Sequence, residues 1–232
     1  MERTYAVILA GGRGLRLNRT TPKQFLSLGG KPIIVWSLEA CHSLAEIDHI
    51  LAVIPEEYIT QTDEIARVFH IHKLLKIIPG GSTRQESAYN ALISLPFNDE
   101  DVLIFHDAAR PFIRPDTLRK CVMETKEHGA SAVYVPLQDT VAEIRNDFVS
   151  TVPPRDRMYY AQTPQGFKFA LIKSAHETAV RNGVTATDDV SLVLAAGYRV
   201  KMIEGEYSNF KITTDFDYQA ACRMAETIHK KR

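Results

Sequence analysis

Short apolar runs alternate with longer segments of helical periodicity over the first 136 residues, and this order limits the folds open to the chain. The apolar runs span residues 5–9, 50–54, 74–78, 102–105 and 132–135. The helical patterns span residues 32–43, 56–69, 82–95 and 115–128. Short apolar runs without polar alternation are typical of parallel strands that are buried on both faces. The order therefore predicts an α/β fold, a Rossmann-like, mostly parallel sheet with helices on both faces, whose ligands bind beyond the carboxyl ends of the strands.

The pattern changes after residue 136. Residues 138–152 alternate like two antiparallel strands, with Asn146-Asp147 as the candidate turn. Helical patterns return at 169–181 and 188–196, and a strand at 198–203 precedes a last helix at 215–229. No linker, repeat or low-complexity segment interrupts the chain. We therefore expect one domain over residues 1–232, with a protruding β-arm at about 137–157.

Composition excludes several classes of function. The 28 Lys and Arg residues balance 28 Asp and Glu residues, so the chain lacks the basic surplus of a general nucleic-acid binder. It has no run of about 20 apolar residues, so no membrane-spanning segment is expected. Cys41, Cys121 and Cys222 lie far apart, which argues against a disulfide framework or a zinc site and favours the cytoplasm.

A glycine-rich loop follows the first strand. It reads Leu9-Ala-Gly-Gly-Arg-Gly-Leu-Arg-Leu17 and leads into Thr21-Pro-Lys-Gln24. Its glycines allow backbone N–H groups to approach a polyphosphate, and Arg13, Arg16 and Lys23 add cations. Neither the Walker pattern nor the dinucleotide fingerprint is present. The loop could be an ordinary turn, but the cations and the Pro-Lys-Gln segment favour a nucleoside triphosphate.

Two further strand ends carry polar side chains. Residues 79–87 read Pro-Gly-Gly-Ser-Thr-Arg-Gln-Glu-Ser, and Ser82 with Gln85 has the spacing of a capping box. This segment is either a plain capped turn or a nucleotide site in which Arg84 and Ser87 reach the ligand.

The run His106-Asp-Ala-Ala-Arg-Pro111 follows the fourth strand. Asp107 could hold Mg²⁺, a Mg²⁺-bound water or a ribose hydroxyl, and Arg110 could hold a phosphate. The alternative is an ion pair between these two residues that stabilises the turn. His106 is interpreted as structural rather than catalytic.

Taken together, the motifs resemble those of cytidylyltransferases that make CDP-linked polyol phosphates, and most closely the 2-C-methyl-D-erythritol 4-phosphate cytidylyltransferase family. The similarity covers essentially the whole chain. The matching motifs are Ala10-Gly-Gly-x-Gly-x-Arg16, Pro22-Lys-Gln24, Gly80-Gly-x-x-Arg-Gln-x-Ser87, His106-Asp-Ala-Ala-Arg-Pro111, Asp139-Thr140, Gln162-Thr-Pro-Gln165, Thr187-Asp-Asp189 and Asn209-Phe-Lys-Ile-Thr213. Each motif is weak alone, but eight in the right order are specific.

The resemblance implies a cytoplasmic, CTP-dependent enzyme with Mg²⁺ as cofactor, in which a polyol phosphate oxygen attacks the α-phosphorus of CTP and pyrophosphate leaves. Arg16, Lys23 and Lys211 would hold the triphosphate and stabilise the transition state. The nucleotide would contact Ala10, Gly11, Gly12, Gly14, Gly80, Gly81, Arg84 and Ser87, with Asp107 and Ala108 at the ribose and Asp107 as a candidate metal ligand. The polyol phosphate would contact Arg110, Thr140, Arg155 and Thr187, with Arg155 reaching the partner's site from an arm swapped across a homodimer.

Three alternatives stay open at this point. The stretch Thr151-Val-Pro-Pro-Arg-Asp-Arg157 departs from the family pattern, so Arg157 rivals Arg155 as the acceptor-binding arginine. Met158-Tyr159 and the segment 206–211 lean toward ribitol 5-phosphate cytidylyltransferases, whereas Thr187-Asp-Asp189 and Ala109 lean toward methylerythritol phosphate. An inactive nucleotide-binding module would have lost the cations Arg16, Lys23 and Lys211, all of which are present.

Overall fold

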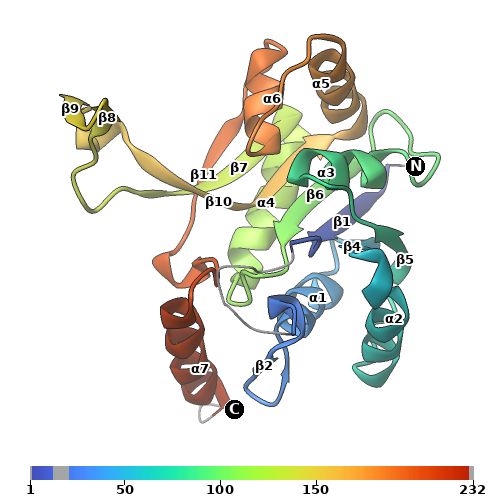
Figure 1. Cartoon of the computed structure of the whole chain (residues 1–232). Helices are drawn as coiled ribbons and strands as arrows, with labels where there is room; N and C mark the ends of the chain where they lie inside the picture. The colour runs from blue at the N-terminus through green and yellow to red at the C-terminus, as the bar shows by residue number, and fades with distance from the viewer. Residues whose placement is uncertain (1, 13–20, 230–232) are drawn as a thin grey trace.

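The computed structural model describes residues 2–12 and 21–229 and centres on a seven-stranded sheet (Figure 1). Its strands are β1 (Thr4–Leu9), β4 (His49–Ile54), β5 (Leu74–Pro79), β6 (Val102–Asp107), β7 (Ala130–Pro136), β10 (Tyr159–Lys168) and β11 (Lys201–Glu204), in the spatial order β11-β7-β10-β6-β1-β4-β5. The pairs β1–β4, β1–β6, β4–β5 and β7–β11 are parallel, and only β10 runs antiparallel to its neighbours β6 and β7. The predicted mostly parallel α/β sheet is thus confirmed.

Helices cover both faces of this sheet. Helices α1 (Ile33–Ser43), α2 (Ile59–Val68) and α4 (Pro115–His128) pack on one face, and α3 (Arg84–Leu92), α5 (Phe169–Arg181) and α6 (Asp189–Ala195) pack on the other. Strand β1 shows why both faces are apolar: Ala6 and Ile8 belong to the first core, and Val7 and Leu9 belong to the second. Period-two alternation of apolar side chains therefore builds two hydrophobic layers around one sheet.

A smaller apolar cluster anchors the C-terminal helix. Helix α7 (Asp215–His229) packs through Ala221 and Ala225 against Leu28 and Ile33. Leu28 lies in β2 (Ser27–Leu28), which pairs with β3 (Lys31–Pro32) in a short hairpin between the glycine-rich loop and α1. This third cluster fixes the segment 207–214, which precedes α7 and returns to the edge of the sheet where the candidate site lies.

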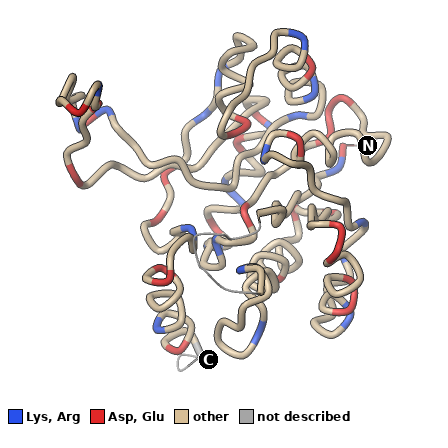
Figure 2. Tube along the Cα trace, viewed as in Figure 1, with Lys and Arg blue, Asp and Glu red and all other residues tan. Residues whose placement is uncertain are grey.

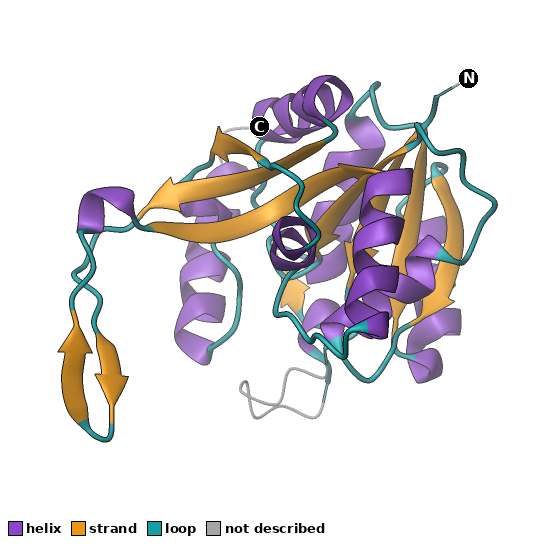
Figure 3. Cartoon of the chain, turned by 90° about the horizontal axis from the view of Figure 1, so that it is seen from above, coloured by secondary structure: helices purple, strands orange, loops and turns teal. Residues whose placement is uncertain are grey.

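The β-arm projects away from the sheet, as predicted (Figure 3). Strands β8 (Glu143–Arg145) and β9 (Phe148–Thr151) pair antiparallel, and Asn146 and Asp147 form the turn with φ values of 49° and 66°. Asn and Asp tolerate this left-handed region better than other residues with a side chain. Residues 138–152 are all exposed, although Phe148 and Val149 are large apolar residues with 78% and 65% exposure.

Several sequence-based boundaries were wrong. Strand β10 was not predicted, because its centre carries Gln162, Thr163 and Gln165, all buried and hydrogen-bonded. The helix expected at 56–69 is a 3₁₀ turn followed by α2, and the helix expected at 82–95 shortens to Arg84–Leu92. The last strand begins at Lys201 rather than 198. Apart from β10, the apolar pattern found the main strands and helices of the sheet, but it did not mark where capping and turn geometry end them.

Charged side chains of both signs are interspersed along the trace, including the tip of the arm (Figure 2). Within the described part of the chain, no helix is both long enough and apolar enough to cross a bilayer.

Candidate active site

A cleft opens at the carboxyl ends of the central strands, where the loops after β1, β5 and β6 meet. Its described lining comprises Leu9, Ala10, Gly11, Gly12, Lys23, Gln24, Gly81, Ser82, Thr83, Arg84, Ser87, Asp107, Ala108, Ala109 and Lys211. Most of the predicted catalytic and nucleotide-binding residues are therefore brought to one place. Gly14 and Arg16 lie outside the described residues. Gly80 lies behind the lining, where a Cβ would come within 3.5 Å of the Gly11 Cα.

The loop after β1 is held by its own backbone and by Gln24. The Ala10 N–H donates to the Val53 carbonyl at 2.9 Å, and the buried Gln24 amide donates to the Ala10 carbonyl at 2.8 Å. Lys23 lies in the turn before Gln24, and its Nζ donates to the Ile212 carbonyl at 3.0 Å. In the Pro-Lys-Gln segment, Gln24 thus holds the glycine-rich loop at its first residue, Ala10, and Lys23 lines the cleft beside the 211–212 segment.

The loop before α3 is closely packed around Ser87. The Ser87 hydroxyl accepts the Gly81 N–H at 3.0 Å and donates to the Thr83 carbonyl at 2.8 Å. A Cβ on Gly81 would lie 2.5 Å from the Cβ of Glu86, so this position requires glycine.

The capping box expected at Ser82 and Gln85 was wrong by one residue. Thr83 is the N-cap and accepts the Glu86 N–H at 3.0 Å, while Glu86 reaches back to the Ser82 N–H at 2.7 Å. The N-terminal end of α3 lies at the cleft, which Ser82, Thr83 and Arg84 line.

Asp107 is the charged centre of the cleft. Its Oδ2 lies 2.9 Å from the Lys211 Nζ and 3.4 Å from the Arg110 Nε. Burial alone would raise the pKa of the Asp107 carboxyl, but Lys211 and Arg110 outweigh burial and hold that pKa well below its usual range. The expected ion pair with Arg110 is therefore present, and Lys211 adds a second cation.

Arg110 faces the sheet rather than the described cleft lining. Its Nη1 donates to the Asn209 carbonyl at 2.9 Å, and its Nη2 donates to the Ala161 carbonyl at 3.3 Å. In this structure the guanidinium joins β10 to the segment that carries Lys211. The geometry thus assigns Arg110 a structural task beside the acceptor-binding role that the sequence suggested.

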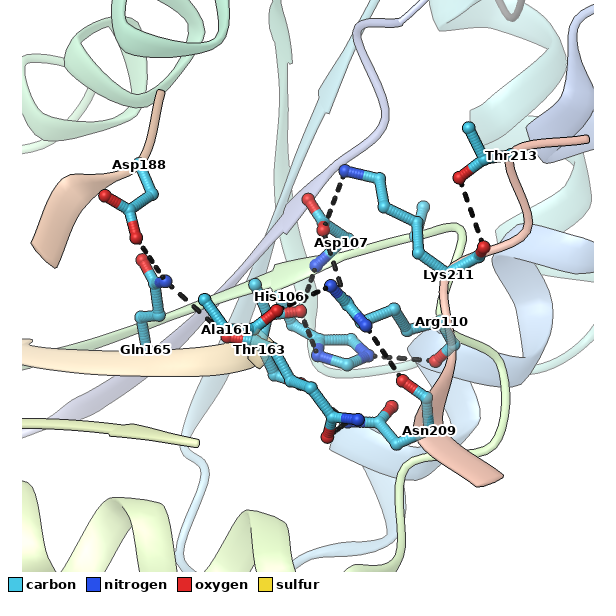
Figure 4. A network of polar contacts seen from close by, with 12 residues as sticks. His106, Asp107, Arg110, Ala161, Thr163, Gln165, Asp188, Asn209, Lys211 and Thr213 are labelled. Atoms are coloured by element: carbon cyan, nitrogen blue, oxygen red, sulfur yellow. Dashed lines mark hydrogen bonds and ion pairs between the residues drawn. The ribbon is translucent and has the colours of Figure 1, made fainter. Parts of the chain in front are cut away.

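His106 lies beneath Asp107 in a polar network that joins β6 to β10 (Figure 4). Its Nε2 is 3.1 Å from the Arg110 carbonyl, which only accepts, so this nitrogen carries the hydrogen of the neutral ring. Its Nδ1 then accepts the Thr163 hydroxyl at 3.0 Å, and Thr163 in turn accepts the Asp107 N–H at 2.9 Å. Burial lowers the pKa of His106 to about 4. The ring is a neutral structural group, in line with the sequence interpretation.

One buried side chain in this network, Asn209, was not among the predicted site residues. Asn209 is fully buried and donates to the Gln162 side chain at 3.0 Å and to the Thr163 carbonyl at 2.9 Å. It fixes the segment that carries Lys211. The motifs at 162–165 and 209–213 contained this signal, but without a structure nothing showed that they contact each other.

The predicted acceptor residues are separated from the nucleotide residues. Thr140 and Arg155 lie at the base of the arm, and neither contributes to the described lining of the cleft of their own chain. Arg155 donates through Nη1 to the Gln138 carbonyl at 3.0 Å, and Arg157 is exposed in the same 3₁₀ turn. Thr187 is exposed in the loop before α6, close to the start of α3, because Gln85 accepts the Ala186 N–H at 3.0 Å.

Comparison with known proteins decides the family. The sequence model described as 2-C-methyl-D-erythritol 4-phosphate cytidylyltransferase matches residues 4–227. The chain belongs to this family. Proteins of that name from Geobacillus kaustophilus and Clostridium novyi are 38% and 35% identical to it, covering 95% and 98% of this chain and 98% and 99% of theirs. The crystal structure of 4-diphosphocytidyl-2C-methyl-D-erythritol synthase from Anaerococcus prevotii superposes with a TM-score of 0.84 at 29% identity, covering 97% of this chain and 99% of that one.

Membership in the methylerythritol phosphate cytidylyltransferase family confirms the resemblance drawn from the motifs. It also fits the chemistry of the cleft, whose described lining contains no histidine or cysteine. Ser87 is engaged by the Gly81 loop, and Asp107 is paired with two cations. The cleft therefore offers cations and backbone N–H groups rather than an activated nucleophile.

Proposed function

We propose that this chain transfers a cytidylyl group from CTP to 2-C-methyl-D-erythritol 4-phosphate, as a step of non-mevalonate isoprenoid synthesis in the cytoplasm. An oxygen of the acceptor phosphate forms a bond to the α-phosphorus of CTP, the bond from that phosphorus to the bridging oxygen breaks, and pyrophosphate leaves. The attacking phosphate is already anionic, so no general base is required. The observation that carries the proposal is a family member's cleft with Lys23 and Lys211 beside glycine-rich loops.

The protein's contribution is to bring two polyanions together and to stabilise the charge that grows on the α-phosphate. Lys23 and Lys211 are suited to this because both line the cleft, and Arg16 is proposed as a third cation. The Gly80–Gly81 loop, Arg84 and Ser87 would surround the cytosine, and Asp107 and Ala108 would border the ribose.

Mg²⁺ fits this site as an ion that the triphosphate carries. Asp107 is the only carboxylate in the described lining, and its Oδ2 already meets Lys211 and Arg110. One carboxylate is too few to build an all-protein magnesium site, whereas Mg²⁺ commonly binds through one or two carboxylates and substrate phosphates. Asp107 would supply one protein oxygen, and the ion would offset the negative charge of the phosphates.

The acceptor is tested by turnover. Pyrophosphate release is measured with CTP and either methylerythritol phosphate or ribitol 5-phosphate at matched concentrations. We expect a higher kcat/KM for methylerythritol phosphate, because the relatives described above carry that name. A higher kcat/KM with ribitol 5-phosphate would make that compound the acceptor, and CTP binding without pyrophosphate release in the presence of either acceptor would support the inactive module.

A homodimer would complete the acceptor side of the site. The arm exposes Ile144, Phe148 and Val149 to solvent, and Arg155 at its base lies off the cleft of its own chain. Exposed apolar strands are commonly covered by association. We propose that the arm crosses to a second copy and that Arg155 binds the acceptor phosphate there.

Mixed dimers test the crossing. A chain with Arg155→Ala and a chain with Lys23→Ala would each be impaired, but one site of their heterodimer would receive Lys23 from one chain and Arg155 from the other. We expect partial recovery of activity in verified heterodimers, and a higher acceptor KM in Arg155→Ala alone. Heterodimers as inactive as both parents would contradict the shared site. Arg157→Ala serves as the matched control. A raised acceptor KM in Arg157→Ala would instead assign binding of the acceptor phosphate to Arg157.

A further inference from the structure

A second cluster of buried polar side chains lies behind the nucleotide side of the cleft, and the chemistry described above does not use it. Asp189 begins α6 and His176 lies within α5, and both are fully buried. The Asp189 Oδ2 accepts Nη1 of Arg84 at 2.7 Å, and its Oδ1 lies 3.0 Å from Nε2 of His176. A carboxylate without a proton only accepts, so the imidazole donates through Nε2. Each oxygen of Asp189 therefore has one donor.

The neighbours of Asp189 favour its charged form. Burial would raise the pKa of its carboxyl, but Arg84 and His176 outweigh burial and hold that pKa below its usual value. Burial likewise disfavours the charged form of Arg84, but Asp189 outweighs burial and raises the pKa of the guanidinium. Arg84 and Asp189 thus form an ion pair that His176 supports at the other carboxylate oxygen.

Stability alone is a poor reason for such a cluster. Removing charges from water commonly costs as much as their attraction returns, and a well-packed apolar cluster avoids that cost. The pair does fix the direction of the Arg84 guanidinium, and Arg84 lines the cleft. Its Nη2 is buried and has no partner among the described residues, so the guanidinium has a donor left for an acceptor on a ligand.

The first turns of α3 are braced against the same elements. The Tyr89 ring stacks on the His176 ring, with centroids 6.0 Å apart and planes inclined by 23°. Gln85 accepts the Ala186 N–H at 3.0 Å and donates to the Val184 carbonyl at 3.3 Å. His176 therefore contacts α3 directly through Tyr89 and is linked to Arg84 of the same helix through Asp189.

We propose that Asp189 and His176 are positioning residues for the nucleotide, which fix the Arg84 guanidinium at the cleft wall in the direction from which it meets the pyrimidine base of CTP. The inference rests on the proposed function, because it takes CTP as the ligand. Neither residue touches the reacting atoms. Loss of His176 should therefore weaken CTP binding, while kcat and the acceptor KM change by less than about twofold.

The test measures the Kd of CTP by calorimetry on full-length variants that melt cooperatively. His176→Leu removes the donor to Asp189 and should weaken CTP about tenfold, because an Arg84 side chain that is no longer fixed in advance must be ordered when CTP binds. His176→Gln retains an N–H donor and should restore most of the affinity. Ile172→Val removes one buried methyl group from the same helix outside the cluster, and it should bind CTP like the wild type. If His176→Leu fails to fold, Asp189→Asn gives the same test, because it removes the carboxylate charge that holds Arg84.

A double variant separates positioning from general loosening. Because His176 acts through Arg84, Arg84→Gln/His176→Leu should bind CTP no more weakly than Arg84→Gln alone. An equal further loss in the double variant, or wild-type affinity in folded His176→Leu, would overturn the positioning role. If the wild type binds CTP but transfers no cytidylyl group to methylerythritol phosphate, the proposed function is overturned and this inference still stands.

Discussion

Acid should destabilise the protein through His106 in a way that one substitution removes. The side chain is fully buried, and in the folded protein its pKa lies at about 4 instead of the ordinary 6.5. The folded state therefore disfavours protonation of this ring. A group whose folded pKa is depressed contributes stability that is fully present above the unfolded pKa and is lost as the pH falls toward the folded pKa. The window for His106 is pH 6.5 down to about 4.

The size of the effect follows from the two pKa values. The shift of the His106 pKa from 6.5 to about 4 corresponds to about 3 kcal/mol of unfolding free energy once the pH is well below both values. About 2 kcal/mol of this is already lost at pH 5. The structure supplies the reason. Protonation would place a hydrogen on Nδ1, where the Thr163 hydroxyl now donates, and that hydroxyl would lose its acceptor inside the network.

Urea unfolding at pH 7.5 and pH 5 measures this loss. His106→Gln cannot titrate, so its free energy of unfolding should fall by about 2 kcal/mol less than that of the wild type between the two pH values. The test compares the pH-dependent change in unfolding free energy between the two proteins. The hydrogen bonds that the substitution breaks are lost at every pH, and the carboxylates titrate equally in both proteins, so neither affects this comparison. His72→Gln removes an exposed histidine and should follow the wild type. Parallel pH responses of the wild type and His106→Gln would refute the reasoning.

Two further substitutions test the cleft itself. Lys23→Ala should lower kcat by about 10²-fold in pre-steady-state turnover and change the Kd of CTP much less, because its ammonium is assigned to charge that grows in the transition state; unchanged turnover would remove Lys23 from the mechanism. Gly81→Ala should destabilise the protein by about 1–3 kcal/mol in thermal melting and weaken CTP, because the added methyl overlaps the Cβ of Glu86. Gly12→Ala, where a Cβ meets nothing within 4 Å, should leave the melting temperature unchanged, and an equally unchanged melting temperature in Gly81→Ala would show that the Gly81 loop simply moves aside.

The sequence predicted those strands whose side chains are apolar on both faces. Strand β1 is an example, since all six of its residues are buried and all but Thr4 lie in an unbroken apolar run. Strand β10 was not predicted because the buried side chains at its centre are polar and are held by hydrogen bonds rather than by apolar packing. Gln162 is paired with Asn209 and Thr163 with His106, and those partners are 47 and 57 residues away in the sequence. Hydrophobic periodicity is a local signal and carries no information about such pairings.

The candidate site divides in the same way. Gly81, Lys23 and Asp107 were predicted because each lies in a short motif directly after or close to a strand end, and parallel strands bring those ends together. His176 and the Asp189 contact were not predicted, because α5 resembles any amphipathic helix and the residues that meet at Asp189 lie 105 and 13 positions away. The motifs identified residues that line the cleft, whereas the residues that hold them in place are visible only once the helices are packed.

The described cations of the cleft share one property: each is held by an acceptor of the chain itself. Lys211 pairs with Asp107, Lys23 donates to the Ile212 carbonyl, and Arg84 pairs with Asp189. These contacts keep like charges in place although they repel one another, so the cleft can retain its shape in the absence of a polyanion. The Lys211 side chain is 37% exposed, whereas the Asp107 side chain that it meets is 10% exposed and also has Arg110 beside it. An incoming phosphate can therefore approach the exposed Lys211 ammonium while Arg110 still balances the charge of Asp107, whereas Arg84, bound to a fully buried carboxylate, keeps its place.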